Sequence, residues 1–122
     1  MYLVPDDDVS AHLLRQNIHH YTIRGDRREA VGYCWLVTDA ALALRTGNIG
    51  YYITPAHRGQ GYAARALDRM IDLAKRKGLI SVTIFCEAEN AASLGILRKL
   101  AERRHITEER APGRRIRLRV HL

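Results

Sequence analysis

Apolar and polar residues alternate in several short stretches of this chain, as they do in half-buried β-strands. The alternation is complete over residues 115–122, where Ile116, Leu118, Val120 and Leu122 lie between arginines and a histidine. The same pattern predicts strands over residues 18–24, 30–37, 48–54 and 81–86. The turn residues at 111–113 and the polar stretch from His105 predict that the last strand closes a hairpin.

Two other stretches have apolar residues at every third or fourth position, which predicts amphipathic helices. The first helix begins at Ala63 and ends at Gly78, a residue suited to a left-handed stop. The second starts with Asn90 as N-cap and runs to about Arg104. A short helix is also predicted over residues 9–17, with Asp8 as N-cap, while residues 38–46 fit either a helical turn or a strand extension.

Composition narrows the class of protein. A chain of 122 residues predicts one domain, residues 1–122. Cys34 and Cys86 lie in apolar strands without metal-ligand spacing, which favours buried thiols in a reducing compartment and no metal site. We find no signal peptide or membrane-length apolar run and expect a cytoplasmic protein. The net charge of +7 fits a nucleic-acid partner, a membrane surface or a polyanionic cofactor.

A glycine-bearing loop connects the strand at 48–54 to the first helix. Gly59 and Gly61 allow a ligand to approach the backbone closely, and they precede a helix N-terminus, where unpaired N–H groups attract anions. Arg58 lies beside them. The loop therefore predicts a phosphate-binding site.

Together with a second motif, these residues resemble the GNAT superfamily of acetyl-CoA-dependent N-acetyltransferases. Arg58, Gly61 and Ala63 match the pyrophosphate-loop pattern of that family, and residues 87–93 resemble its acidic-x-x-Asn-x-x-Ser segment. The two motifs span residues 47–104. The resemblance implies a single α/β domain with a mixed, mostly antiparallel sheet flanked by helices. It also implies transfer of an acetyl group from acetyl-CoA, as cosubstrate, directly to an amine.

The resemblance also implies particular site residues. In the family the strand before the loop diverges from the next strand at a bulge and pairs with the pantetheine arm, which points here to Tyr52, Ile53 and Thr54. A backbone N–H at this divergence can hold the thioester oxygen. The remaining cofactor-binding residues are the loop and the start of the next helix, namely Arg58, Gly59, Gln60, Gly61, Tyr62, Ala63, Ala64, Asn90 and Ser93. Tyr52 and Glu87 are candidates for a catalytic base or relay, beside deprotonation through water. Tyr51 and Tyr52 point to opposite faces, and the sequence does not say which of them faces the cleft.

The chain departs from the family at three points. Leu97 stands seven residues after Asn90, where many relatives carry a tyrosine that protonates the departing thiolate. Ala101 and Glu102 replace the usual Gly-aromatic end of that helix. The N-terminal region offers little or none of the family's first strand and helical pair, which makes a homodimer with a completed acceptor site plausible.

Three alternatives to an acetyltransferase were considered, of which the first is disfavoured and the other two stay open. Gly59, Gly61 and Ala64, with Glu87 downstream, also satisfy a dinucleotide-binding fingerprint, but the loop starts too far from its strand and too little chain follows for such a sheet. A coenzyme-binding module without catalysis fits the missing tyrosine. A nucleic-acid-binding protein fits the arginine row at 115–119, although no nucleic-acid-binding motif accompanies it.

Overall fold

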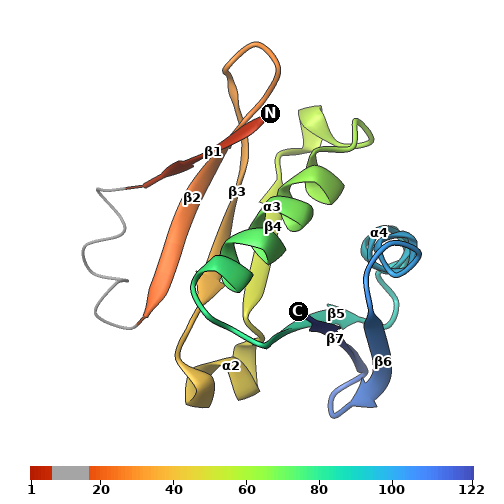
Figure 1. Cartoon of the computed structure of the whole chain (residues 1–122). Helices are drawn as coiled ribbons and strands as arrows, with labels where there is room; N and C mark the ends of the chain where they lie inside the picture. Colours follow the sequence, from red (N-terminus) through yellow and green to blue (C-terminus); the bar gives the residue numbers. More distant parts are fainter. Residues whose placement is uncertain (7–16) are drawn as a thin grey trace.

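The structure is a computed structural model, and it describes residues 1–6 and 17–122. The described residues form two antiparallel sheets and three α-helices (Figure 1). The first sheet has the order β1-β2-β3-β4 and the second the order β5-β7-β6. The strands are β1 (Tyr2–Pro5), β2 (Ile18–Arg24), β3 (Ala30–Val37), β4 (Ile49–Ile53), β5 (Ser81–Glu87), β6 (Ile106–Ala111) and β7 (Arg115–His121). The helices are α2 (Ala40–Thr46), α3 (Tyr62–Arg76) and α4 (Ala91–Leu100). The predicted fold class, sheets flanked by helices, is confirmed.

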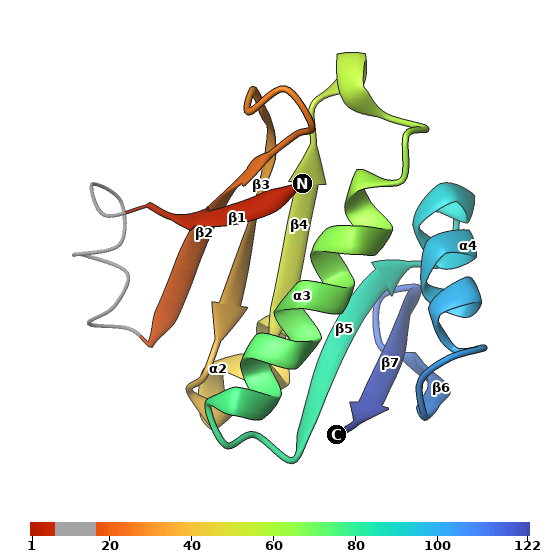
Figure 2. The same ribbon diagram turned by 45° about the horizontal axis from the view of Figure 1, so that its top comes forward.

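Helix α3 carries the central part of the core. Its apolar face is buried along its whole length, and Ala66, Met70 and Ala74 are fully inaccessible. The helix connects β4 to β5 and packs against both of these strands and against α4 (Figure 2). In Figure 2, β4 and β5 both run upward, and α3 runs back down between them. The start of α3 therefore lies near the C-terminal end of β4.

Asn48 joins the two sheets at one end. Its backbone N–H donates to the carbonyl of Thr83 at 2.6 Å, and its side-chain Oδ1 accepts from the Thr83 N–H at 2.8 Å. Its Nδ2 donates to the carbonyl of Val37 at 2.9 Å. Beyond this junction β4 and β5 belong to different sheets and move apart (Figure 2). The divergence needs no bulge, because the β3–β4 register is continuous, and in that respect the expectation of a bulge is wrong.

The predicted strands and the main helix are confirmed within one or two residues. Helix α3 begins at Tyr62, after Gly61, and Gly78 has the left-handed φ of 91° expected of the stop. Residues 38–46, left between two possibilities, contain α2, which is N-capped by Asp39 through a 3.0 Å bond from the Leu42 N–H. The helix predicted over residues 9–17 falls almost wholly outside the described residues.

Two features, a strand near the N-terminus and the end of helix α4, differ from the expectation. A first strand does exist: β1 pairs with β2 from Tyr2 opposite Arg24 to Pro5 opposite Tyr21. Helix α4 ends at Leu100 and not at Arg104, because Arg104 turns back to donate to Asp68 and Asp72 on α3 at 3.0 Å. Two antiparallel sheets also rule out the doubly wound parallel sheet of a dinucleotide-binding domain.

The second sheet has one buried and one basic face, as the alternation predicted. Ile116, Leu118 and Val120 are buried, and the arginines between them lie on the other face. Part of this positive charge is neutralised within the fold, since Arg117 donates to Glu109 at 2.9 Å. Among the described helices, none is long and apolar enough to cross a membrane.

Candidate active site

A cleft of about 790 Å³ opens where β4 and β5 diverge. One end is formed by the loop between β4 and α3, and its walls by β4, β5 and the start of α4. The other end lies on the sheet face opposite α3, where Trp35, Phe85 and Arg115 line it. A ligand that binds the loop can thus reach the opposite face of the sheet through the gap between the strands.

The loop at the end of β4 has the properties of an anion site. Gly59 and Gly61 have φ angles of 76° and 82°, in the left-handed region that favours glycine. No side chain caps the N-terminus of α3, and the N–H groups of residues 59–64 have no protein acceptor among the described residues. These donors and the positive end of the helix dipole favour a phosphate.

Arg58 is directed back towards β4. Its Nε donates to the Ile53 carbonyl at 2.9 Å, and its guanidinium lies 5.4 Å from the centre of the Tyr52 ring. The two terminal nitrogens have no acceptor among the described residues, so they remain available to an anion at the loop. Of the predicted loop residues, the structure places Arg58, Gly59, Gly61, Tyr62, Ala63 and Ala64 on the cleft, while Gln60 is an exposed residue outside its lining.

The free edge of β4 faces the cleft. Val37 N–H donates to the Asn48 carbonyl and Thr54 N–H to the Val31 carbonyl, which fixes the hydrogen-bonded pairs of the β3–β4 ladder. By the alternation of an antiparallel ladder, Tyr51 and Ile53 direct their N–H and C=O groups away from β3. Tyr52, by contrast, exchanges its backbone bonds with β3. Of the three residues predicted to pair with pantetheine, only Ile53 therefore presents its N–H to the cleft.

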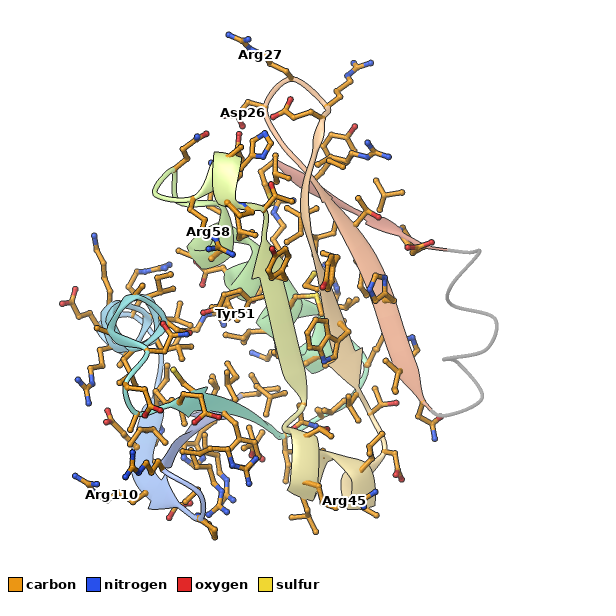
Figure 3. All side chains as sticks on the ribbon, turned by 180° about the vertical axis from the view of Figure 1, so that it is seen from behind. Asp26, Arg27, Arg45, Tyr51, Arg58 and Arg110 are labelled. Carbon is orange, nitrogen blue, oxygen red and sulfur yellow. The ribbon has the colours of Figure 1, made fainter. Side chains whose placement is uncertain are left out.

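Tyr51 also brings a side chain that sequence reasoning did not assign. Its hydroxyl is 2.5 Å from the hydroxyl of Ser93 on α4, and Figure 3 shows it on the side of β4 that faces α4. Burial raises the pKa of the Tyr51 phenol above its ordinary value, and the Ser93 hydrogen bond offsets part of this rise. The phenol is therefore neutral at physiological pH and can donate a proton. Its orientation depends on the β3–β4 register, which the sequence does not give.

Asn90 and Ser93 meet at the start of α4. The Oδ1 of Asn90 accepts from the Ser93 N–H at 3.1 Å, so Asn90 is the N-cap. Both residues line the cleft. The capping role expected of Asn90 is confirmed, and coenzyme contact by either residue stays a prediction.

The two predicted catalytic candidates lie at different places. Tyr52 is on the face opposite α3, where its ring stacks on Tyr33 with centroids 5.3 Å apart. Glu87 is exposed at the end of β5. Both line the cleft. His57 is half-buried on the cleft, and its Nδ1 lies 2.7 Å from the Thr54 hydroxyl.

Aromatic and basic side chains form the far end of the cleft, and sequence reasoning missed them as well. The indole of Trp35 lies over Gly50, where an added Cβ would come within 2.0 Å of the ring. The guanidinium of Arg115 lies 4.2 Å from the Phe85 ring centre. The pairing of Gly50 with Trp35 in two neighbouring strands is the one sequence signal that could have located this end of the cleft. The described residues contain no His/Cys/Asp/Glu group that could hold a metal ion.

Two diverging strands, with a glycine loop and a helix N-terminus at one end of the gap, fit an acyltransferase. The family model named acetyltransferase (GNAT) domain matches residues 6–101. The chain therefore belongs to the GNAT acetyltransferase family. No curated protein matches its sequence significantly.

Solved structures of the same fold cover almost the whole chain. A chimera of spermidine N-acetyltransferase from Vibrio cholerae is 15% identical, with a TM-score of 0.69, over 94% of this chain and 78% of that one. An acetyltransferase from Agrobacterium tumefaciens is 18% identical, with a TM-score of 0.68, over 92% of this chain and 66% of that one. A domain from Methanocaldococcus jannaschii is 15% identical, with a TM-score of 0.71, over 95% and 74%. At these identities the likeness concerns the fold.

Proposed function

We propose that this protein transfers the acetyl group of acetyl-CoA directly to the nitrogen of an amine acceptor. The observation that carries the proposal is the continuous cleft from the anion-binding loop to the opposite face of the sheet. A cofactor with a pyrophosphate at one end and a reactive group at the other fits such a passage. Acetyl-CoA supplies an activated acetyl group. The protein therefore has to bind acetyl-CoA, admit the amine, take a proton from the amine and give a proton to the departing thiolate.

Binding relies on backbone groups and one arginine. The N–H groups of residues 59–64 and the guanidinium of Arg58 hold the pyrophosphate. The cleft-facing N–H and C=O groups of Tyr51 and the N–H group of Ile53 pair with the amide groups of the pantetheine arm, and one of these N–H groups can stabilise negative charge on the acetyl oxygen. Asn90 and Ser93 add polar contacts from α4.

The amine enters from the face with Trp35, Phe85 and Glu87. It must lose a proton before it attacks, because only the neutral amine has a lone pair. Glu87 at the end of β5 is exposed to solvent and can accept this proton directly or through a water molecule.

Tyr51 is the proposed donor of the second proton, in place of the tyrosine that Leu97 replaces. A side chain on a helix covers the turn N-terminal to its own Cα, so a tyrosine at position 97 would reach back to the turn of Ser93. The Tyr51 hydroxyl reaches this same turn from β4. Leu97 itself is fully buried in the core.

A binding experiment with matched glycine variants tests the proposal. We expect saturable calorimetric binding of acetyl-CoA, weak dependence on salt, and no binding of NADH or of a short RNA. Gly61→Glu should abolish binding of acetyl-CoA, because it places a carboxylate and a side chain in the anion site. Gly113→Glu in the β6–β7 turn is the control, since Gly113 has a similar φ of 76° and equally open surroundings.

Both variants place a side chain at left-handed φ and should lose about 1–2 kcal/mol of stability. Loss of acetyl-CoA binding in Gly61→Glu alone supports the loop assignment. Equal binding by the two variants contradicts it. Salt-sensitive binding of RNA without binding of acetyl-CoA would favour the nucleic-acid alternative.

A further inference from the structure

The lining of the cleft carries more positive than negative charge. Of the described residues that line the cleft, Glu87 is the only carboxylate, against the guanidinium groups of Arg58 and Arg115. Arg58 lies at the loop end, where the proposed function assigns it to the pyrophosphate. Arg115 lies at the other end and has no role in that function.

The hydrogen-bond partners of Arg115 are neutral carbonyl groups. Its Nε donates to the Pro112 carbonyl at 3.3 Å and its Nη1 to the Arg45 carbonyl at 3.2 Å. No carboxylate among the described residues lies within ion-pair distance of it, although Glu87 is its register partner across the β5–β7 ladder. Arg117, two residues further along the same face, is instead paired with Glu109.

The position of Arg115 is fixed by its neighbours. Its guanidinium lies over the Phe85 ring, and two carbonyl bonds hold it from the β6–β7 turn and from the end of α2. The Nη2 group has no acceptor among the described residues. Such a planar fork with spare donors on an apolar floor is suited to a carboxylate or a phosphate.

We propose that the acceptor of this enzyme is an amine that bears an anionic oxygen group, a carboxylate or a phosphate, on the same molecule. Arg115 binds the anionic group, Glu87 across the β-ladder receives the ammonium proton, and the rings of Trp35 and Phe85 cover the carbon skeleton between them. The inference rests on the proposed acetyl transfer and specifies its substrate class. A polyamine, which is a polycation, meets a single carboxylate among the described cleft residues and an uncompensated arginine.

Matched pairs of amines test the substrate class. β-Alanine and propylamine differ in a carboxylate, and phosphoethanolamine and ethanolamine differ in a phosphate. We expect kcat/KM to be at least about tenfold higher for one of the two amines with an anionic group than for its counterpart without that group, as expected for a charged hydrogen bond. The pair with the larger ratio identifies the anionic group. Spermidine should be a worse acceptor than either anionic amine.

Arg115→Gln should raise KM for the preferred anionic amine about 10- to 100-fold and leave KM for the counterpart without the anionic group unchanged. Arg119→Gln is the control, because Arg119 lies on the same strand and face but does not line the cleft. A second readout does not depend on turnover: the anionic amine should bind the dead-end complex with coenzyme A, and Arg115→Gln should weaken this binding by the same factor.

The failures of the two proposals are distinguishable. If acetyl-CoA does not bind, acetyl transfer itself is refuted. If acetyl-CoA binds but spermidine or the amines without an anionic group are preferred, the substrate class is wrong. Unchanged parameters in an Arg115→Gln variant that binds acetyl-CoA normally would overturn the role of Arg115. The preference of the unaltered protein decides the question if this variant does not fold.

Discussion

The Tyr51 hydroxyl on β4 lies 2.5 Å from the Ser93 hydroxyl on α4, and this contact bridges two elements that both line the cleft. One hydroxyl donates to the other, so the pair has a further proton and lone pairs to offer a ligand. No other side-chain hydrogen bond between described residues connects β4 to α4.

Tyr51→Phe should therefore reduce kcat about 10- to 100-fold while the affinity for acetyl-CoA changes less than about threefold. The phenyl ring keeps the packing and loses only the proton donor. Because burial raises the pKa of Tyr51, the activity that depends on it should persist at mildly alkaline pH. Steady-state kinetics from about pH 7 to pH 10, with calorimetry for acetyl-CoA, measure both quantities.

Ser93→Ala separates the proton donor from its partner. It removes the hydroxyl bond and leaves the phenol in place, so kcat should fall less than in Tyr51→Phe. A Tyr51→Phe variant with normal kcat would show that the proton comes from water or from another residue.

Asn48→Ala should lower the free energy of unfolding by about 2–4 kcal/mol, because it deletes one buried and one part-buried side-chain hydrogen bond and leaves the Val37 carbonyl and the Thr83 N–H without these partners. Urea denaturation measures the loss. Thr107→Ala, which deletes the bond between Thr107 and His121 on the exposed sheet face, should cost less than about 0.5 kcal/mol. Equal losses in the two variants would contradict the role of Asn48 as the junction of the sheets.

Asp68 links α3 to the chain after α4 through Arg103 at 2.7 Å and Arg104 at 3.0 Å. Burial opposes ionisation of Asp68, but the hydrogen bonds from the two arginines outweigh it and lower the pKa of the carboxyl group. A lowered pKa in the folded state stabilises the protein above the carboxyl pKa of the unfolded chain, about 4, and this contribution disappears as pH falls through the lowered value.

The difference in the free energy of unfolding between the unaltered protein and Asp68→Asn should therefore be largest near neutral pH and should shrink below about pH 4. Urea titrations at about pH 7 and pH 3 measure it. Asp72→Asn is the control, since Asp72 is more exposed and pairs with Arg104 alone. A difference that does not depend on pH would mean that Asp68 acts by packing and not by its charge.

The sequence predicted the elements whose patterns are long and regular. Helix α3, the alternating β7 and the glycine loop followed from periodicity and from backbone requirements. Helix α2 did not, because residues 38–46 satisfy two patterns and the choice depends on the Asp39 cap and on Gly47, whose φ of 79° ends the helix. Strand β1 is four residues long and exists through its pairing with β2, which is a tertiary interaction.

The sequence predicted the parts of the candidate site that are local motifs. It did not predict the side-chain contacts between segments that are distant in the sequence. The loop at residues 58–64 is local in sequence, so its motif could be read directly. Tyr51 and Ser93 are 42 positions apart, and Arg115 meets the Arg45 carbonyl across 70 positions. Such contacts depend on strand register and on how the two sheets meet, and neither is encoded in a local pattern.

The divergence of β4 and β5 leaves each strand at the edge of its own sheet. Open edges can accept a strand from another molecule, which is a common route to aggregation. A coenzyme that pairs with β4 occupies this edge and also stabilises the folded state by mass action. The concentration of the coenzyme would then control how long the protein stays in solution on heating. A coenzyme bound at β4 would in this way protect the protein against self-association.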